Sequence, residues 1–179
     1  ERGTIDVLVN NAGIQHIDKV EDFPLEKWNL LIGIMLTGPF LTIKYALPHM
    51  KKQKYGRIIN VSSVHGKIAV PYKSAYCSAK FGLIGLTKTV ALETAKLGIT
   101  VNALLPGPVR TELIEKQLEK LAQQDGTTIK EALEKHILGM QPMKRLLEPS
   151  EVASAAIFLA SDGAAAITGD CINVSGGEG

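Results

Sequence analysis

Three residues have types and spacing that could move a proton at an alcohol or carbonyl carbon: Ser63, Tyr76 and Lys80. Tyr76 and Lys80 are four positions apart, so on a helix their side chains leave the same face on successive turns. A free tyrosine has a pKa of about 10, and a neighbouring ammonium favours the phenolate and lowers that pKa. Tyr76 could then act as a general acid or base while the Ser63 hydroxyl holds the reacting oxygen.

The Tyr76–Lys80 spacing is weak when taken alone, because a tyrosine with a lysine four positions later is common on solvated helix surfaces. The other three tyrosines, however, have no lysine at that offset. Ser63 also follows an apolar run of the sequence, and a later apolar run ends in Pro106-Gly107. This joint pattern favours an active site over a solvated pair.

Four short apolar runs predict the strands that would position these residues, at 6–11, 57–62, 99–105 and 171–174. They are apolar on successive residues, which is typical of strands covered on both faces in a parallel sheet. Polar or glycine-containing turns follow the first three runs. Since the carboxyl ends of parallel strands meet at one edge, we expect these turns to face one crevice.

Helices are predicted between and after the strands, at 25–51, 74–97 and 151–160, with one or two more within 111–138. Gly38-Pro39 should kink or interrupt the first of them, because an interior proline removes a backbone hydrogen bond. The alternation predicts an α/β fold with a doubly wound parallel sheet. The charged segment 111–148 lies outside this pattern, and we expect it to form a helical cover over the substrate.

The composition predicts one globular domain and excludes several classes of function. The net charge of +2 is spread along the 179 residues, which argues against a nucleic-acid partner. The longest uncharged stretch, 28–43, is shorter than the roughly 20 residues of a membrane span, so we expect a buried helix and no membrane. Cys77 and Cys171 lack the spacing of metal ligands and the density of a disulfide scaffold, which predicts no metal and a cytoplasmic protein.

Several motifs resemble those of the short-chain dehydrogenase/reductase family over essentially the whole chain: Asn10 to Gly13, Ser63, Tyr76 to Lys80 and Pro106-Gly107. The resemblance implies the C-terminal part of a Rossmann-type domain, a nicotinamide cofactor and a homo-oligomer, by analogy a tetramer. NAD is the expected cofactor, with NADP left open. The implied cofactor-binding residues are Asn11, Ala12, Gly13, Tyr76, Lys80, Pro106, Gly107, Val109 and Thr111.

Four polar residues placed after strands or near the Tyr76 helix suit a small carboxylate substrate: Gln15, His65, Lys73 and Gln141. Lys73 could supply the charge and the others hydrogen bonds. Within the family, the stretches 11–16, 47–52 and 72–76 resemble bacterial D-3-hydroxybutyrate dehydrogenases, in which the matching four positions hold the substrate carboxylate. That resemblance implies oxidation of D-3-hydroxybutyrate to acetoacetate, with 3-oxoacyl thioesters and sugar-derived alcohols as alternatives.

Departures from the family pattern keep a second hypothesis open, that of a truncated or decayed inactive copy. The sequence starts at Glu1 without the Gly-rich turn that seats a dinucleotide, so about two βα units should be missing and an apolar sheet edge exposed. We therefore expect the chain alone to be unstable or dependent on partners. Met35 stands where the family usually has an asparagine that links the active lysine to water, and 175–179 replaces the usual Asp-Gly-Gly end.

Overall fold

The computed structural model describes residues 3–179, apart from the side chains of Leu113 and Lys120. A four-stranded, fully parallel sheet occupies the centre of the molecule in the order β1-β2-β3-β4. The strands are β1 (Val7–Asn10), β2 (Gly56–Val61), β3 (Ile99–Pro106) and β4 (Cys171–Val174). The predicted parallel sheet and its four strands are confirmed, with no boundary shifted by more than one residue.

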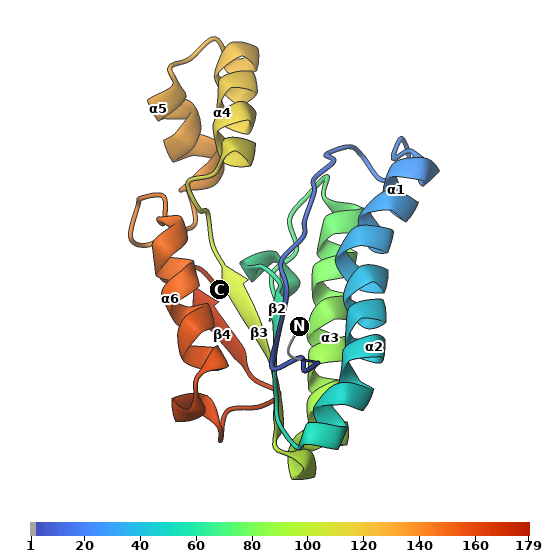
Figure 1. Cartoon of the computed structure of the whole chain (residues 1–179). Coiled ribbons are helices and arrows are strands. Elements are labelled where there is room, and N and C mark those ends of the chain that lie inside the picture. The colour runs from blue at the N-terminus through green and yellow to red at the C-terminus, as the bar shows by residue number, and fades with distance from the viewer. Residues whose placement is uncertain (1–2) are drawn as a thin grey trace.

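Helices cover both faces of this sheet (Figure 1). On one face lie α1 (Leu25–Ile32), α2 (Gly38–Gln53) and α3 (Ser74–Thr94), and on the other lies α6 (Pro149–Ala160). The two layers explain the successive apolar residues of the strands. Ile58 packs with α2 and α3, whereas its neighbour Ile59 packs with Leu159 of α6.

A π-helical turn, Gly33–Thr37, joins α1 to α2 without a break in the helix. Pro39 has no N–H to donate to the carbonyl of Met35, so the α-helical ladder cannot continue there. The hydrogen bonds instead take π spacing, with the Gly38 N–H bonded to the Gly33 carbonyl. The predicted interruption is thus present, one turn earlier than Gly38-Pro39.

By length and composition the continuous helical segment Leu25–Gln53 could cross a membrane, a test that core helices of soluble proteins also pass. In the structure it lies along α3, with its buried side chains facing the protein and the rest of its surface exposed. The expectation of a buried helix therefore holds for one face only.

Two helices and a π-helical turn form a separate structure beyond the carboxyl ends of the strands (Figure 1). They are α4 (Glu112–Asp125), α5 (Ile129–Ala132) and the turn Leu133–Ile137. Gly126 ends α4 in a left-handed conformation, and Thr128 and Glu131 cap α5 reciprocally. One or two helices were expected in this segment, and the structure has two.

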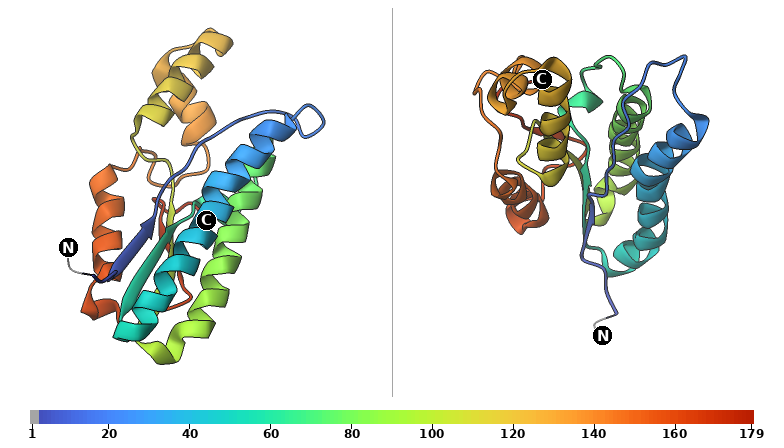
Figure 2. Two further views of the ribbon diagram at one scale, coloured as in Figure 1. Left: turned by 45° about the vertical axis from the view of Figure 1, so that its right-hand side comes forward. Right: turned by 90° about the horizontal axis from the view of Figure 1, so that it is seen from above.

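Strand β1 forms one edge of the sheet, as Figure 2 shows from two further directions. Its burial alternates along the strand: Leu8 packs against the core, whereas Val7 and Val9 are 43% and 48% exposed. An apolar edge of this kind is the feature expected from a sequence without the first βα units.

Candidate active site

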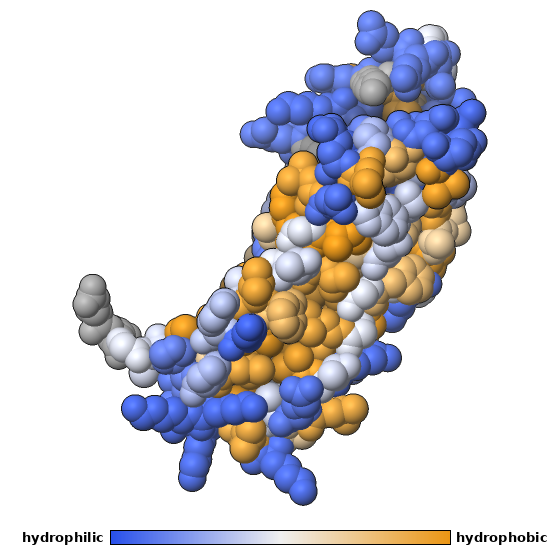
Figure 3. Space-filling view, turned by 90° about the vertical axis from the view of Figure 1, so that its right-hand side faces the viewer, coloured by the Kyte–Doolittle hydropathy of each residue, from blue (hydrophilic) through white to orange (hydrophobic). Residues whose placement is uncertain are grey.

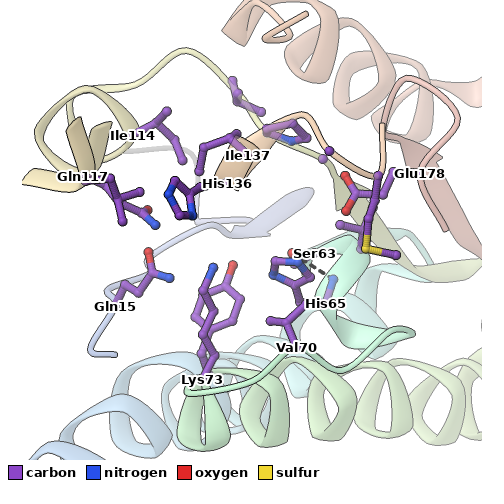
Figure 4. Close-up of a pocket in the computed structure, with 18 of the residues that line it drawn as sticks. Gln15, Ser63, His65, Val70, Lys73, Ile114, Gln117, His136, Ile137 and Glu178 are labelled. Atoms are coloured by element: carbon purple, nitrogen blue, oxygen red, sulfur yellow. Dashed lines mark hydrogen bonds between the residues drawn. The ribbon is translucent and has the colours of Figure 1, made fainter. Parts of the chain in front are cut away.

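A cavity of about 580 Å³ opens at the carboxyl ends of the strands, below α4 and the π-helical turn that follows α5. Ser63, Tyr76, Lys73, Gln15 and His65 all contribute to its wall (Figure 4). They come from three separate turns of the chain. The crevice predicted from the strand ends is therefore present, and its wall brings Ser63 and Tyr76 together with three of the four predicted substrate residues, Gln15, His65 and Lys73.

Ser63 is fixed directly after strand β2 in an extended backbone conformation, with φ of −172°. Its side-chain oxygen accepts a hydrogen bond from the backbone N–H of His65 at 3.1 Å. Because that contact uses the oxygen as an acceptor, the hydroxyl proton stays available for another partner. Ser63 can thus donate to an oxygen atom bound in the cavity.

Tyr76 and Lys80 lie on the first two turns of α3, with the Lys80 Nζ 5.6 Å from the centre of the Tyr76 ring. The Lys80 ammonium donates to the Val61 carbonyl at 2.8 Å, and the Ser62 hydroxyl donates to the Lys80 carbonyl at 3.0 Å. These two bonds tie α3 to the end of β2. The proton-handling pair is therefore held at a fixed distance from Ser63.

Burial dominates the electrostatics of this pair. It raises the pKa of Tyr76 above its ordinary value, and the nearby Ser63 hydroxyl offsets only part of the effect. Burial also lowers the pKa of Lys80 to about 8. The expectation that the Lys80 ammonium brings the pKa of Tyr76 below its ordinary value is not met in this structure, because desolvation of the phenolate is the largest influence and raises that pKa. Tyr76 accordingly holds its proton at neutral pH.

The remaining predicted substrate residues divide into two groups. Gln15, His65 and Lys73 line the cavity, but Gln141 is fully buried beside it, where its side-chain oxygen accepts the backbone N–H of Arg145 at 2.9 Å. Its neighbour Met140 lines the cavity instead. A contact between Gln141 and substrate stays a prediction.

Near Ser63 and Tyr76, the positive charge of the cavity wall lies on Lys73 and not on His65. Burial and the nearby Lys73 ammonium lower the pKa of His65 to about 4, so its imidazole is neutral at pH 7. Burial also lowers the pKa of Lys73, while Cys77 and Glu178 act in the opposite direction. The part of the wall next to Ser63 and Tyr76 therefore offers the Lys73 cation and the neutral hydrogen-bonding ring of His65.

Lys73 follows a strained loop residue, Tyr72, that places it at the wall of the cavity. Tyr72 has a φ of 65°, in the left-handed region that a bulky side chain rarely adopts. Its carbonyl accepts the backbone N–H of Asp18 at 3.0 Å, which joins the loop after β1 to the loop before α3. That bond explains why Gln15 and Lys73, far apart in sequence, line the same wall.

The residues implied to bind a dinucleotide lie at the ends of β1 and β3. Gly107, Val109 and Thr111 line the cavity directly after Pro106, the last residue of β3. Asn11, Ala12 and Gly13 follow β1 and are exposed.

The surroundings of Lys80 fit the hydroxyl groups of a ribose. A Cβ placed on Gly13 would lie 4.0 Å from the Lys80 Nζ, so the absence of a side chain leaves room beside the ammonium. Lys80 uses one donor on Val61, and an ammonium has three. Met35 also approaches this spot, with its sulfur 3.8 Å from the same Cβ position, and cannot donate a hydrogen bond.

Sequence reasoning missed four polar residues of the cavity wall. Gln117, Lys135 and His136 come from the helical segment above the cavity, and Glu178 comes from the turn after β4. Figure 4 labels three of them, Gln117, His136 and Glu178. Only Glu178 had a signal, because the end of the sequence departs from the family pattern there. Among the residues that the structure describes, no group of three or more His, Cys, Asp or Glu could hold a metal ion.

Comparison with known proteins is consistent with this geometry. The family model described as enoyl-(acyl carrier protein) reductase matches residues 1–178. The D-beta-hydroxybutyrate dehydrogenase of Rhizobium meliloti (strain 1021) is 49% identical over 175 residues, which cover 98% of this chain. The chain belongs to the short-chain dehydrogenase/reductase family. The same dehydrogenase from Cupriavidus necator is 47% identical, again over 98% of the chain.

Solved structures of short-chain dehydrogenases support the same fold. The crystal structure of levodione reductase superposes with a TM-score of 0.89 at 34% identity and covers 98% of this chain. The match spans 67% of the reductase and 68% of the two dehydrogenases. The four strands and their helices are thus the C-terminal part of a short-chain dehydrogenase Rossmann fold. Members of the family are NAD(P)-dependent oxidoreductases.

Proposed function

We propose that this short-chain dehydrogenase transfers a hydride between NAD and a small 3-hydroxy acid, with the interconversion of D-3-hydroxybutyrate and acetoacetate as the reference reaction. The observation that carries the proposal is the presence of Lys73 in the cavity that Ser63 and Tyr76 share. Two relatives at 49% and 47% identity bear the name of that dehydrogenase, which supports the choice of substrate.

The residues of this chain handle the oxygen and its proton. When bound, the nicotinamide supplies or receives the hydride. Ser63 donates its free hydroxyl proton to the substrate oxygen and so stabilises the charge that develops there. Tyr76, protonated at neutral pH, gives its proton to that oxygen in reduction. In oxidation the Tyr76 phenolate, formed when that proton leaves to solvent, takes the proton of the alcohol.

The substrate carboxylate would bind near Lys73, whose ammonium is the cation on that side of the cavity. Gln15 and the neutral ring of His65 would add hydrogen bonds. The Gln141 Nε2, which has no partner among the described residues, would donate a further one without breaking the bond that its Oε1 accepts from Arg145. A neutral alcohol would leave the half-buried Lys73 ammonium without a counter-ion, which favours an acid over a sugar alcohol.

Lys80 would hold the ribose next to the nicotinamide, and the segments 11–13 and 106–111 would contact other parts of the cofactor. We propose NAD because of the dehydrogenases named above. The choice between NAD and NADP depends on a residue of the family fold that lies outside the matched region.

A homo-oligomer in the cytoplasm fits the surface of the chain. Figure 3 shows apolar side chains gathered on the outer face of the helices. The exposed large apolar residues of α2 and α3 are Phe40, Leu41, Tyr45, Phe81 and Leu92. A second copy of the chain would remove them from water. Both cysteines are free thiols, as suits a reducing compartment.

The substrate class can be tested with Lys73→Ala in the protein expressed from its complete coding sequence. Loss of one charge-assisted hydrogen bond should raise the KM for D-3-hydroxybutyrate about tenfold to a hundredfold. Steady-state kinetics with NAD would measure it. Lys67→Ala is the control, because Lys67 is exposed and bonds Asn173 outside the cavity.

The outcomes separate the candidate functions. An unchanged KM in Lys73→Ala would exclude a carboxylate bound at this lysine. Turnover of a 3-oxoacyl thioester or a sugar alcohol alone would move the assignment to that class. No turnover of any of the three substrates would favour the inactive copy.

A further inference from the structure

Glu178 places a carboxylate in the wall of the cavity at the side away from Lys73. Figure 4 shows the two residues on opposite sides, with Ser63 and His65 between them. Glu178 comes from the turn after β4, whereas Lys73 comes from the loop before α3. A molecule that reaches Ser63 and Tyr76 therefore has a cation on one flank and an acid on the other.

The turn that carries Glu178 is held by several hydrogen bonds. The Ser175 hydroxyl donates to the Glu178 carbonyl, and the Asn173 amide donates to the Gly179 carbonyl at 3.4 Å. The Met143 N–H donates to the Gly176 carbonyl at 3.1 Å. Gly177, with φ of 92°, packs against Pro142. The backbone of Glu178 is thus fixed from both the sheet and the segment before α6.

Glu178 is the one acidic side chain among the residues that line the cavity. Two other basic side chains on the wall, Lys135 and His136, are held elsewhere, because both contact Asp125, at 2.6 and 2.7 Å. Neither Glu178 nor Lys73 forms an ion pair with any residue that the structure describes. The cavity therefore holds two separated, opposite charges that no protein group neutralises at contact distance.

Because Glu178 is partly buried, the group that a bound molecule places beside its carboxylate affects how well that molecule binds. Desolvation raises the pKa of Glu178, and the distant Lys73 ammonium lowers it only in part. A methyl group placed beside such a carboxylate would displace the water that solvates it and would offer no hydrogen bond in its place. An ammonium group would replace the water with a charge-assisted hydrogen bond and favour the ionised acid.

We propose that Glu178 is a specificity-determining residue that makes this site prefer zwitterionic 3-hydroxy acids, with the carboxylate toward Lys73 and a cationic group at the far end toward Glu178. The inference rests on the proposed function and deepens it, since the reaction at the hydroxyl carbon is unchanged. The probe is 4-amino-3-hydroxybutyrate, which is 3-hydroxybutyrate with an ammonium on its terminal carbon.

The test compares kcat/KM for 4-amino-3-hydroxybutyrate and for 3-hydroxybutyrate in the protein expressed from its complete coding sequence, with NAD. We expect the amino acid to be the better substrate by at least about tenfold. Glu178→Gln removes the charge and keeps the shape. It should lower kcat/KM for the amino acid and raise it for 3-hydroxybutyrate, so that the preference is lost or reversed.

Glu93→Gln is the matched control, because Glu93 is an exposed residue near the far end of α3 and should leave the preference unchanged. If the enzyme oxidises 3-hydroxybutyrate well but shows no preference for the ammonium compound, or if Glu178→Gln keeps the wild-type ratio, this inference is wrong and the proposed function stands. If neither compound is oxidised, the proposed function itself fails and the inference with it.

Discussion

Burial decides the protonation of each functional side chain in the cavity. Tyr76 keeps its proton because the phenolate would be poorly solvated, and Lys80 loses part of its basicity for the same reason. The four-residue spacing alone suggests a tyrosine activated by its lysine. In the structure the ammonium donates to the Val61 carbonyl, so Lys80 serves first to anchor α3 to β2.

His65 gives a residue-level prediction about pH. Its pKa is about 4 in the folded chain against 6.5 ordinarily, so between these values the unfolded chain binds a proton that the folded chain does not. Stability from this group is present above the higher value and lost as pH falls toward the lower one. We expect the urea midpoint to decrease from about pH 7 to about pH 5, and to decrease less in His65→Gln.

His49→Gln, at an exposed position on α2, should keep the wild-type decrease. Glu178 opposes His65 over part of this range, because its raised pKa lets the folded chain bind the extra proton. The comparison of the two histidine variants isolates His65, since Glu178 is common to both. Equal decreases in both variants would show that His65 does not titrate as its burial requires.

At the scale of elements, one glycine joins the end of α3 to the start of β3. Gly98 has a φ of 72°, and a Cβ there would lie 2.4 Å from the Lys54 carbonyl oxygen. Gly98→Ala should therefore lower the free energy of unfolding by about 2 kcal/mol or more, through strain and this clash. Chemical denaturation would measure it.

Gly85→Ala is the matched control within the same helix. A Cβ on Gly85 meets no atom within 4 Å, so alanine should raise stability by about 0.5–1 kcal/mol. Similar losses in both variants would mean that α3 tolerates no added methyl group and that Gly98 has no special role.

The sequence predicted the elements better than it predicted the cavity. Apolar runs of the strands and the glycine after α3 are local signals, and each led to the right element. Pro39 signalled an interruption, but the π turn lies at Gly33–Thr37 because the hydrogen bonds missing at a proline are those of the preceding turn.

The cavity was harder to predict because its wall is assembled from distant segments. Ser63, Tyr76, Lys73 and Gln15 were found from strand ends and helix spacing. Gln117 and His136 carry no local signal, since only the fold of the segment above the cavity brings them to the wall. Gln141 was expected there from its position in the sequence, like Gln15, His65 and Lys73, but its present bond to Arg145 could not be predicted from spacing.

At the scale of the whole molecule, we expect the open edge of the sheet to determine whether the chain self-associates in solution. Val7 and Val9 are exposed on a strand that has one neighbour only. The 179-residue chain expressed alone should self-associate through this edge, which light scattering would detect. Val9→Lys should reduce the association, whereas Val20→Lys, at a more exposed valine outside the sheet, should not.

A chain that stays monomeric and unfolds cooperatively at high temperature would contradict this prediction. Association that persists unchanged in Val9→Lys would point instead to the apolar outer face of α2 and α3.

The hydrogen bonds that fix α3 to β2 divide the site into two parts that can change independently. Tyr76, Lys80 and Ser63 sit on a rigid strand and helix, whereas Gln15, Lys73 and Glu178 stand on three separate turns. With the roles proposed above, we expect a substitution on a turn to alter which molecule is accepted and to leave the proton chemistry intact. Single mutations on these turns would then give the scaffold new substrates without passing through an inactive protein.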